Sequence, residues 1–258
     1  MTKHIDLNCD MGESFGAWTM GADAEVMPWV TSVNIACGFH AGDPVTMCKT
    51  VKAAAEADVA IGAHVALPDL AGFGRRAMAV SADEVFAMTV VQLGALMAMV
   101  STVDARVGHV KPHGALYHMA EQQPDIADAL VDAVAAVDRS LRVVGLAGGE
   151  LVGAAEEAGL RASNEAFIDR RYQKDGSLVP RGEEGAVIDD PEQALAQALE
   201  LVRAGRAPLA GGGHVKIAAD TLCIHGDRSD AAVFAQTIHE GLREAGVEMR
   251  APQRHPGE

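Results

Sequence analysis

The stretch Asp6-Leu7-Asn8-Cys9-Asp10-Met11-Gly12-Glu13 begins within a predicted β-strand at residues 4–8. Successive side chains of a strand point to opposite faces, so Asp6, Asn8 and Asp10 share one side. Three polar groups on one face of a buried parallel strand are costly unless they are paired or bind a ligand. The stretch therefore favours a functional site, with a structural polar network as the alternative.

The rest of the chain alternates short β-type runs with longer helical patterns. Further strands are predicted at residues 32–36, 59–63, 107–111, 141–146, 161–167 and 221–225. Helices are predicted at residues 44–57, 81–103, 124–137, 149–158, 191–204 and 230–245. This alternation is typical of βαβ units and predicts a mostly parallel sheet.

Seven strands fit either a closed barrel or an open doubly wound sheet. No GxGxxG follows a strand, so the usual nucleotide site of an open sheet is missing. Polar motifs follow at least six of the strands, as expected when site residues ring the C-terminal mouth of a barrel. We therefore predict one α/β domain over residues 1–258, a seven-stranded (β/α) barrel, and 258 residues suit that size.

One polar segment interrupts the alternation. Residues 170–190 read RRYQKDGSLVPRGEEGAVIDD, with an Asp-Gly pair, a proline and two further glycines. This composition predicts a hairpin or a long loop. Long loops in compact domains are often lids, so a lid is the first interpretation and a surface insertion the second.

Composition limits the classes of function. The net charge is −15 and the pI about 5.0, and no basic stripe offsets this charge, so binding to nucleic acid is not expected. The amino terminus lacks the apolar run of a signal peptide, and no run of 18 consecutive apolar residues predicts a membrane span. None of the four cysteines forms a CxxC pair. A cytoplasmic protein with reduced thiols is expected.

Two histidines near strand ends are candidate site residues. His40 lies in NIACGFHAGDP at residues 34–44, whose glycines allow sharp turning. His64 closes the third predicted strand. Both are expected at the barrel mouth.

The block HVKPHGALY at residues 109–117 ends the fourth predicted strand. His109, Lys111 and His113 alternate toward one face there. A lysine that points into a barrel among carboxylates needs either a buried salt bridge or a catalytic task. Chemistry is the favoured interpretation.

Two arginines and the last strand end complete the candidates. Arg75, in GFGRR, and Arg170, at the base of the 170–190 segment, can hold a carboxylate or a phosphate. A solvated or capping role is the alternative for Arg75. His225 and Asp227 lie in CIHGD, after the last strand.

A metal site is an open alternative. Imidazole and carboxylate suit Zn, Mn or Fe, and the candidate ligands are Asp10, His40, His64 and His113. No HExxH spacing is present, so the ligands would come from separate strands. A GxxxxGK[ST] loop is absent as well, so a nucleotide needs another kind of site or a partner protein.

These motifs, in this order, resemble the LamB/YcsF family of lactam-utilisation proteins. The matching blocks, from residue 6 to residue 227, are DLNCDMGE, NIACGFHAGDP, GFGRR, HVKPHGALY, DRRY, RGEEGAVI and CIHGD. The resemblance implies a barrel of the glycoside hydrolase/deacetylase type. It also implies ATP-dependent opening of 5-oxo-L-proline to L-glutamate together with two partner subunits, with ATP as co-substrate, bound with Mg.

The implied reaction suggests catalytic roles. Lys111 is expected to stabilise the phosphoryl charge or the developing oxyanion. Asp10 or His40 is expected to be the general base, and His113 the proton donor to the ring nitrogen. Arg75 or Arg170 would hold the substrate carboxylate. The residues expected to orient these groups are Glu13, His64, His225 and Asp227.

Two other functions stay open at this point. One is a metal-dependent amidohydrolase or deacetylase that acts alone. The other is a non-catalytic subunit that binds a lactam while its partners carry out the chemistry.

Overall fold

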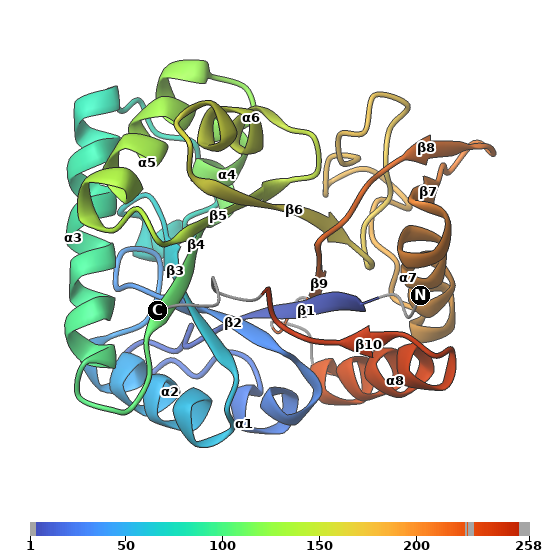
Figure 1. Cartoon of the computed structure of the whole chain (residues 1–258), viewed down its shortest axis with the longest axis horizontal. Coiled ribbons are helices and arrows are strands. Elements are labelled where there is room, and N and C mark those ends of the chain that lie inside the picture. Colours follow the sequence, from blue (N-terminus) through green and yellow to red (C-terminus); the bar gives the residue numbers. More distant parts are fainter. Residues whose placement is uncertain (1–3, 225, 227–229, 253–258) are drawn as a thin grey trace.

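The computed structural model describes residues 4–224, 226 and 230–252 (Figure 1). Seven parallel strands form the centre of the molecule. They are β1 (His4–Met11), β2 (Ser32–Ala36), β3 (Ala60–Val65), β4 (Val107–Pro112), β5 (Arg142–Leu146), β6 (Arg161–Phe167) and β9 (Thr221–Ile224). They pair in that order, and β9 pairs again with β1, so the sheet closes. The predicted seven-stranded (β/α) barrel is confirmed.

Helices surround the barrel on its outside (Figure 1). They are α1 (Asp23–Val26), α2 (Pro44–Glu56), α3 (Ala82–Val100), α4 (Gly114–Ala120), α5 (Pro124–Val137), α6 (Glu150–Glu157), α7 (Pro191–Ala204) and α8 (Ala231–Glu244). Six of them match predicted helices, and the short α1 and α4 were not predicted. Two single-turn 3₁₀ helices, η1 (Met27–Trp29) and η2 (Leu70–Gly72), were also missed.

Local sequence explains where the main helices begin. The carboxylate of Asp43 accepts the backbone N–H of Val45 at 2.8 Å, and Pro44 fits the first turn of α2. Ser81 and Glu84 form a reciprocal capping box before α3. Both α5 and α7 begin with a proline. These signals mark the first residue of each of these helices.

Three short strands lie outside the predicted pattern. β7 (Arg206–Pro208) and β8 (His214–Lys216) form an antiparallel pair beside the barrel, and β10 (Glu248–Met249) extends the sheet next to the start of β1. Each is two or three residues long, which is too short for a period-two pattern to show.

The barrel is apolar between its wall and the helices but polar inside. Leu7 and Cys9 point outward and are fully buried in the main hydrophobic core. Asp6 and Asn8 point inward. Asp6 accepts hydrogen bonds from Thr31, Ser32 and Thr221 at 2.6–2.8 Å. The barrel interior near the N-terminal ends of the strands is therefore a structural polar network.

Helix α3 is the one helix among the described residues that is long and apolar enough to span a membrane, with a mean hydropathy of 1.5. It packs on α5, β3 and β4. Its buried Gln92 bonds both the N–H and the C=O of Ala66, just beyond β3. These contacts show that α3 packs against the outside of the barrel.

Candidate active site

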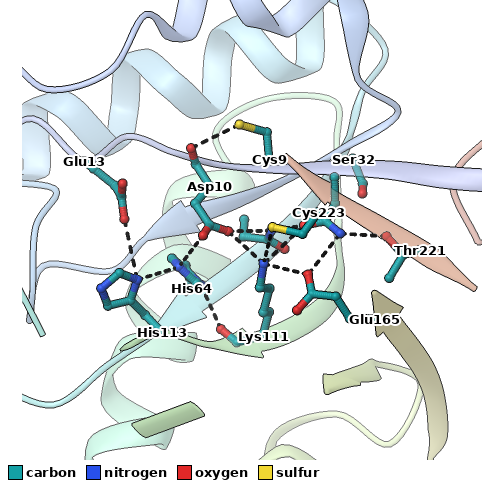
Figure 2. Close-up of polar contacts among 12 residues, drawn as sticks. Cys9, Asp10, Glu13, Ser32, His64, Lys111, His113, Glu165, Thr221 and Cys223 are labelled. Carbon is teal, nitrogen blue, oxygen red and sulfur yellow. Dashed lines mark hydrogen bonds and ion pairs between the residues drawn. The ribbon is translucent and has the colours of Figure 1, made fainter. Parts of the chain in front are cut away.

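A cavity of about 750 Å³ opens at the C-terminal ends of the strands. Asp10 reaches it from β1, His64 from β3 and Lys111 from β4, and Glu13 and His113 follow directly after β1 and β4. Figure 2 shows these five side chains directed toward one another. A second cavity, of about 400 Å³, lies at the opposite end of the barrel and is lined by strand-start residues such as Asp6 and Arg142.

Lys111 is the buried cation at the centre of this site. It is 2% exposed, and its ammonium lies 2.7 Å from Glu165 Oε1 and 3.1 Å from Asp10 Oδ1 (Figure 2). Burial by itself lowers a lysine pKa, but the carboxylates of Asp10 and Glu165 outweigh it and raise the pKa of Lys111 well above its usual value. Lys111 is therefore a permanent cation between two buried carboxylates.

Glu165 was missed by the sequence interpretation. It is fully buried in β6 and also accepts a hydrogen bond from Asn8 at 3.1 Å. The signal that could have found it is a lone glutamate inside the otherwise uncharged run Ala162–Phe167 of a buried strand. Such a carboxylate requires a partner.

Asp10 is the carboxylate of this group that faces the cavity. Its Oδ1 accepts hydrogen bonds from Asn34 at 2.8 Å and from Lys111. Its Oδ2 lies 3.3 Å from His64 Nε2, and the side chain keeps 13% of its surface exposed. Asp10 thus has two donors on Oδ1, while Oδ2 lies beside His64.

Hydrogen bonds to backbone carbonyls fix the tautomers of two histidines. His64 Nδ1 lies 3.0 Å from Lys111 O, and His113 Nε2 lies 2.8 Å from Phe73 O. A carbonyl only accepts, so these two nitrogens carry the protons. The other two, His64 Nε2 and His113 Nδ1, face each other at 2.9 Å (Figure 2).

His40 lies behind this pair. Its ring stacks on that of His113 with centroids 3.9 Å apart, and its Nε2 is 3.0 Å from Glu13 Oε1. Burial, and then the neighbouring His64, lowers the pKa of His40 well below its usual value. Burial, and then His40, does the same to the pKa of His113. Both rings are therefore neutral near pH 7.

The backbone beneath the histidines is strained. Phe73 has φ +54°, a left-handed conformation that is uncommon for a bulky residue, and it directs its carbonyl at His113. Gly74 follows with φ +64°, and a Cβ there would lie 2.8 Å from both His113 Cδ2 and His40 Cβ. The glycine of the GFGRR motif is thus required for packing against two site histidines.

Gly74→Ala is expected to lower the free energy of unfolding by about 1–3 kcal/mol, because it adds left-handed strain and two clashes. Thermal unfolding measures the change. Gly94→Ala is the matched control, since Gly94 lies within α3 and a Cβ there meets nothing within 4 Å. It should be neutral or stabilising by up to about 1 kcal/mol. Equal melting temperatures for the two variants would contradict this account.

The two candidate arginines lie at the rim of the cavity. Arg75 lines it from the loop after β3, where its guanidinium lies 5.0 Å from the centre of the Phe73 ring. Arg170 lines it after β6 and donates from Nη2 to Val179 O at 2.6 Å. The neighbouring Arg76 instead pairs with Asp69 and is not part of the cavity wall.

The 170–190 segment forms part of the cavity wall through Arg170, Gln173 and residues 175–181. Isolated bridges join Tyr172 to Leu178 and Arg170 to Val187, so the segment folds back on itself. The Tyr172 hydroxyl accepts the backbone N–H of Phe167, the last residue of β6, at 2.7 Å. This bond anchors the segment beside the site.

Glu121 is a further wall residue with a shifted pKa. Burial raises the pKa of its carboxyl to about 7, although hydrogen bonds from Leu146, Glu150 and Leu151 oppose the shift. Glu121 was not singled out from the sequence, because it lies between the predicted strand at residues 107–111 and the predicted helix at residues 124–137 and belongs to no strand-end motif.

The stability of the fold should therefore fall as pH rises through 7. The folded state holds a proton on Glu121 that the unfolded chain releases near pH 4.5, so this contribution is complete below about pH 4.5 and is lost above about pH 7. The change is on the order of 3 kcal/mol. Glu121→Gln should remove it, as urea unfolding at pH 5 and pH 8 can measure. The same pH dependence in both proteins would show that another group titrates.

The candidates from the sequence thus separate into three groups. The cavity wall contains Asp10, Glu13, His64, Arg75, Lys111, His113 and Arg170. His40 is 1% exposed and touches this group from behind. His225 and Asp227 lie outside the described residues.

The fold and the site together define a class: a (β/α) barrel with acid–base side chains at the C-terminal mouth. Within that class, the chain belongs to the LamB/YcsF family, whose model matches residues 5–256.

Relatives cover nearly the whole chain. A protein from Bordetella pertussis, named as a 5-oxoprolinase subunit, is 53% identical over 251 residues, which are 97% of this chain and 100% of the relative. The protein of the same name from Bacillus subtilis is 50% identical and is matched over 96% of both chains. The crystal structure of a lactam utilization protein from Thermus thermophilus superposes with a TM-score of 0.93 at 45% identity, covering 96% of this chain and 100% of that one.

Proposed function

We propose that this chain is the ring-opening subunit of a cytoplasmic, ATP-dependent 5-oxoprolinase, which converts 5-oxo-L-proline to L-glutamate together with two partner subunits. The observation that carries the proposal is the cavity in which Asp10, Lys111 and the rim arginines converge. The names of relatives at 50–53% identity point to the same reaction.

The chemistry explains why such a site needs help from ATP. A five-membered lactam is a resonance-stabilised amide that water attacks slowly. Phosphorylation of its oxygen makes the carbonyl carbon electrophilic. Water then adds to the carbon, and the C–N bond breaks to leave an acyl phosphate. A second water hydrolyses that acyl phosphate to the carboxylate and free phosphate. The site has to supply a base for water, a cation for the developing negative charge and a handle for the substrate carboxylate.

Asp10 is the residue we assign to proton transfer. Asp10 lines the cavity, and its Oδ1 is held by Asn34 and Lys111. Asp10 takes a proton from the attacking water and then gives it to the ring nitrogen as the C–N bond breaks, so the carboxylate is regenerated. Lys111, fixed beside it, stabilises the negative charge on the oxygen.

The rim arginines bind the substrate carboxylate in this proposal. The guanidinium of Arg75 or Arg170 suits a bidentate contact with a carboxylate. Arg170 belongs to the segment at residues 170–190, which forms part of the cavity wall. We propose that this segment acts as a lid that excludes water other than the nucleophile.

We propose roles for two histidines that differ from those that the sequence suggested. His40 is not part of the cavity wall and is not placed to act as the base. His113 uses its proton on Nε2 to bond Phe73 O, so it has none to offer from Nδ1. We therefore assign protonation of the ring nitrogen to Asp10 and not to a histidine.

ATP, with Mg, is assigned to a partner subunit or to an interface with one. The sequence lacks a GxxxxGK[ST] loop. An acidic protein of net charge −15 also offers little general attraction for a triphosphate.

The test is a reconstitution assay that follows ADP and glutamate formed from 5-oxo-L-proline. The chain alone should be inactive, and the chain with both partner subunits should form glutamate with matching ADP release. ATP-independent hydrolysis of an amide or acetyl group by the chain alone would instead show a self-sufficient amidohydrolase. Full turnover by the partners without this chain would contradict the proposal.

A further inference from the structure

The facing nitrogens of His64 and His113 pose a problem of charge. Each ring donates its one N–H to a backbone carbonyl. His64 Nδ1 lies 3.0 Å from Lys111 O, and His113 Nε2 lies 2.8 Å from Phe73 O. Two lone pairs therefore point at each other across 2.9 Å. Two acceptors at this distance repel unless a proton or a cation lies between them.

Carboxylate oxygens approach the same point. Asp10 Oδ2 lies 3.3 Å from His64 Nε2, and Glu13 Oε1 lies 3.7 Å from His113 Nδ1. One ligand atom from each of Glu13, His40, His64 and His113 falls within 4.8 Å of all the others, and all four residues are buried. A proton on the line between the two nitrogens would bond to those two atoms only, whereas a metal ion would bind the carboxylate oxygen as well.

The surrounding contacts are those of metal-ligating histidines. A histidine that binds a metal through one nitrogen usually donates its other N–H to a carbonyl or carboxylate, which fixes ring orientation. Both rings meet this condition here. His113 donates to the carbonyl of Phe73, and the strained φ of +54° at Phe73 directs that carbonyl toward the His113 ring.

His40 fits an orienting role better than a ligand role. Its Nδ1 is buried and finds no hydrogen-bond partner among the described residues. A buried N–H without an acceptor is costly, so the proton belongs on Nε2, which then donates to Glu13 Oε1 at 3.0 Å. His40 thus holds the carboxylate in place.

We propose that His64 Nε2, His113 Nδ1 and a carboxylate oxygen of Glu13 bind one divalent transition-metal ion. Two imidazoles and one carboxylate suit Zn²⁺, Mn²⁺, Fe²⁺ or Co²⁺. Three protein ligands leave a coordination position open, which is typical of catalytic rather than structural sites. All three ligands line the cavity, so a bound ion can polarise a substrate oxygen or a water near Asp10.

This ligand set differs from the one considered from the sequence, because Glu13 replaces Asp10 and His40 moves to a supporting position. Asp10 Oδ1 is engaged by Asn34 and Lys111, and its Oδ2 lies 3.3 Å from His64 Nε2. The group of ligand atoms that all lie within 4.8 Å of one another nevertheless contains Glu13 and not Asp10. The inference rests on the geometry of the histidines and does not depend on the identity of the lactam or on ATP.

The experiment uses the full chain alone and measures binding rather than turnover. The protein is stripped with a chelator, titrated with Co²⁺ and then with Zn²⁺, and followed by visible absorption and elemental analysis. About one equivalent should bind, with the absorption bands of a cobalt ion that has nitrogen ligands, and Zn²⁺ should displace it. Binding far below one equivalent would overturn the proposal and show that the two nitrogens share a proton.

Variants locate the ion. His113→Gln and Glu13→Gln should weaken binding by more than about 100-fold, since each removes a direct ligand. Glu13→Gln keeps the shape of the side chain and carries the test if His113→Gln does not fold, as circular dichroism will show. The matched control is His118→Gln, because His118 is an exposed histidine on the same cavity wall but outside the cluster. Equal affinity in Glu13→Gln and His118→Gln would place the ion elsewhere and overturn the proposal.

Discussion

Replacing Lys111 with Met is expected to lower the free energy of unfolding by about 3–5 kcal/mol, because it leaves buried carboxylates without their cation. Glu165 is fully buried and lies 2.7 Å from the ammonium, and Asp10 lies 3.1 Å from it. Met keeps the length of the side chain, so the loss is electrostatic rather than steric. Glutamate formation by the reconstituted complex should also fall, by a factor of about 10²–10³, because the cation for the oxyanion is gone.

A surface ion pair of similar length is the control for this prediction. Arg206 Nε lies 2.6 Å from Glu200 Oε2, but both side chains are more than one third exposed. Arg206→Met should leave the melting temperature nearly unchanged. Combining Lys111→Met with Glu165→Gln should recover part of the lost stability without recovering turnover. An unchanged melting temperature in Lys111→Met would show that Lys111 is not needed to hold the site together.

Asp10→Asn is expected to reduce glutamate formation by a factor of about 10²–10⁴ while the fold persists. Asn keeps an oxygen that can accept from Asn34 and Lys111, and Lys111 retains Glu165 as its counter-charge. The substitution removes the base and leaves most of the structure. Steady-state kinetics and thermal unfolding on the same preparation separate these effects.

An exposed carboxylate of the same cavity gives the control for Asp10. Asp175 lines the cavity from the 170–190 segment, and Asp175→Asn should keep turnover within a few-fold of the unmodified chain. Similar losses in Asp10→Asn and Asp175→Asn would point to a general electrostatic effect. Normal turnover in Asp10→Asn would remove Asp10 from the mechanism.

The fold was predictable because its signals are local and repeated. Residues 32–36 and 161–167 were predicted with the bounds that the structure has, and α5 and α7 also match because each begins with a proline. Strand ends were less certain: β1 continues to Met11, three residues past the predicted end. The polar residues Asn8 and Asp10 hid that continuation, since they face inward in a barrel whose interior is polar.

That polar side chains gather at the barrel mouth was predictable, but the partners of these side chains were not. The strand-end positions of Asp10, His64 and Lys111 follow from the topology that brings C-terminal strand ends together. The pairing of Lys111 with Glu165 depends on β6 lying across the barrel, more than fifty residues further along the chain. The tautomers of His64 and His113 depend on the carbonyls of Lys111 and Phe73, which no residue pattern encodes.

The position of bound 5-oxo-L-proline in the assembled complex tests the central claim most directly. A structure of the complex with this lactam and a non-hydrolysable ATP analogue would show it. The account predicts the lactam in the cavity at the barrel mouth, with its carbonyl carbon near Asp10 and Lys111 and its carboxylate on Arg75 or Arg170. A lactam bound only by the partner subunits, with the mouth of this barrel unoccupied, would contradict it.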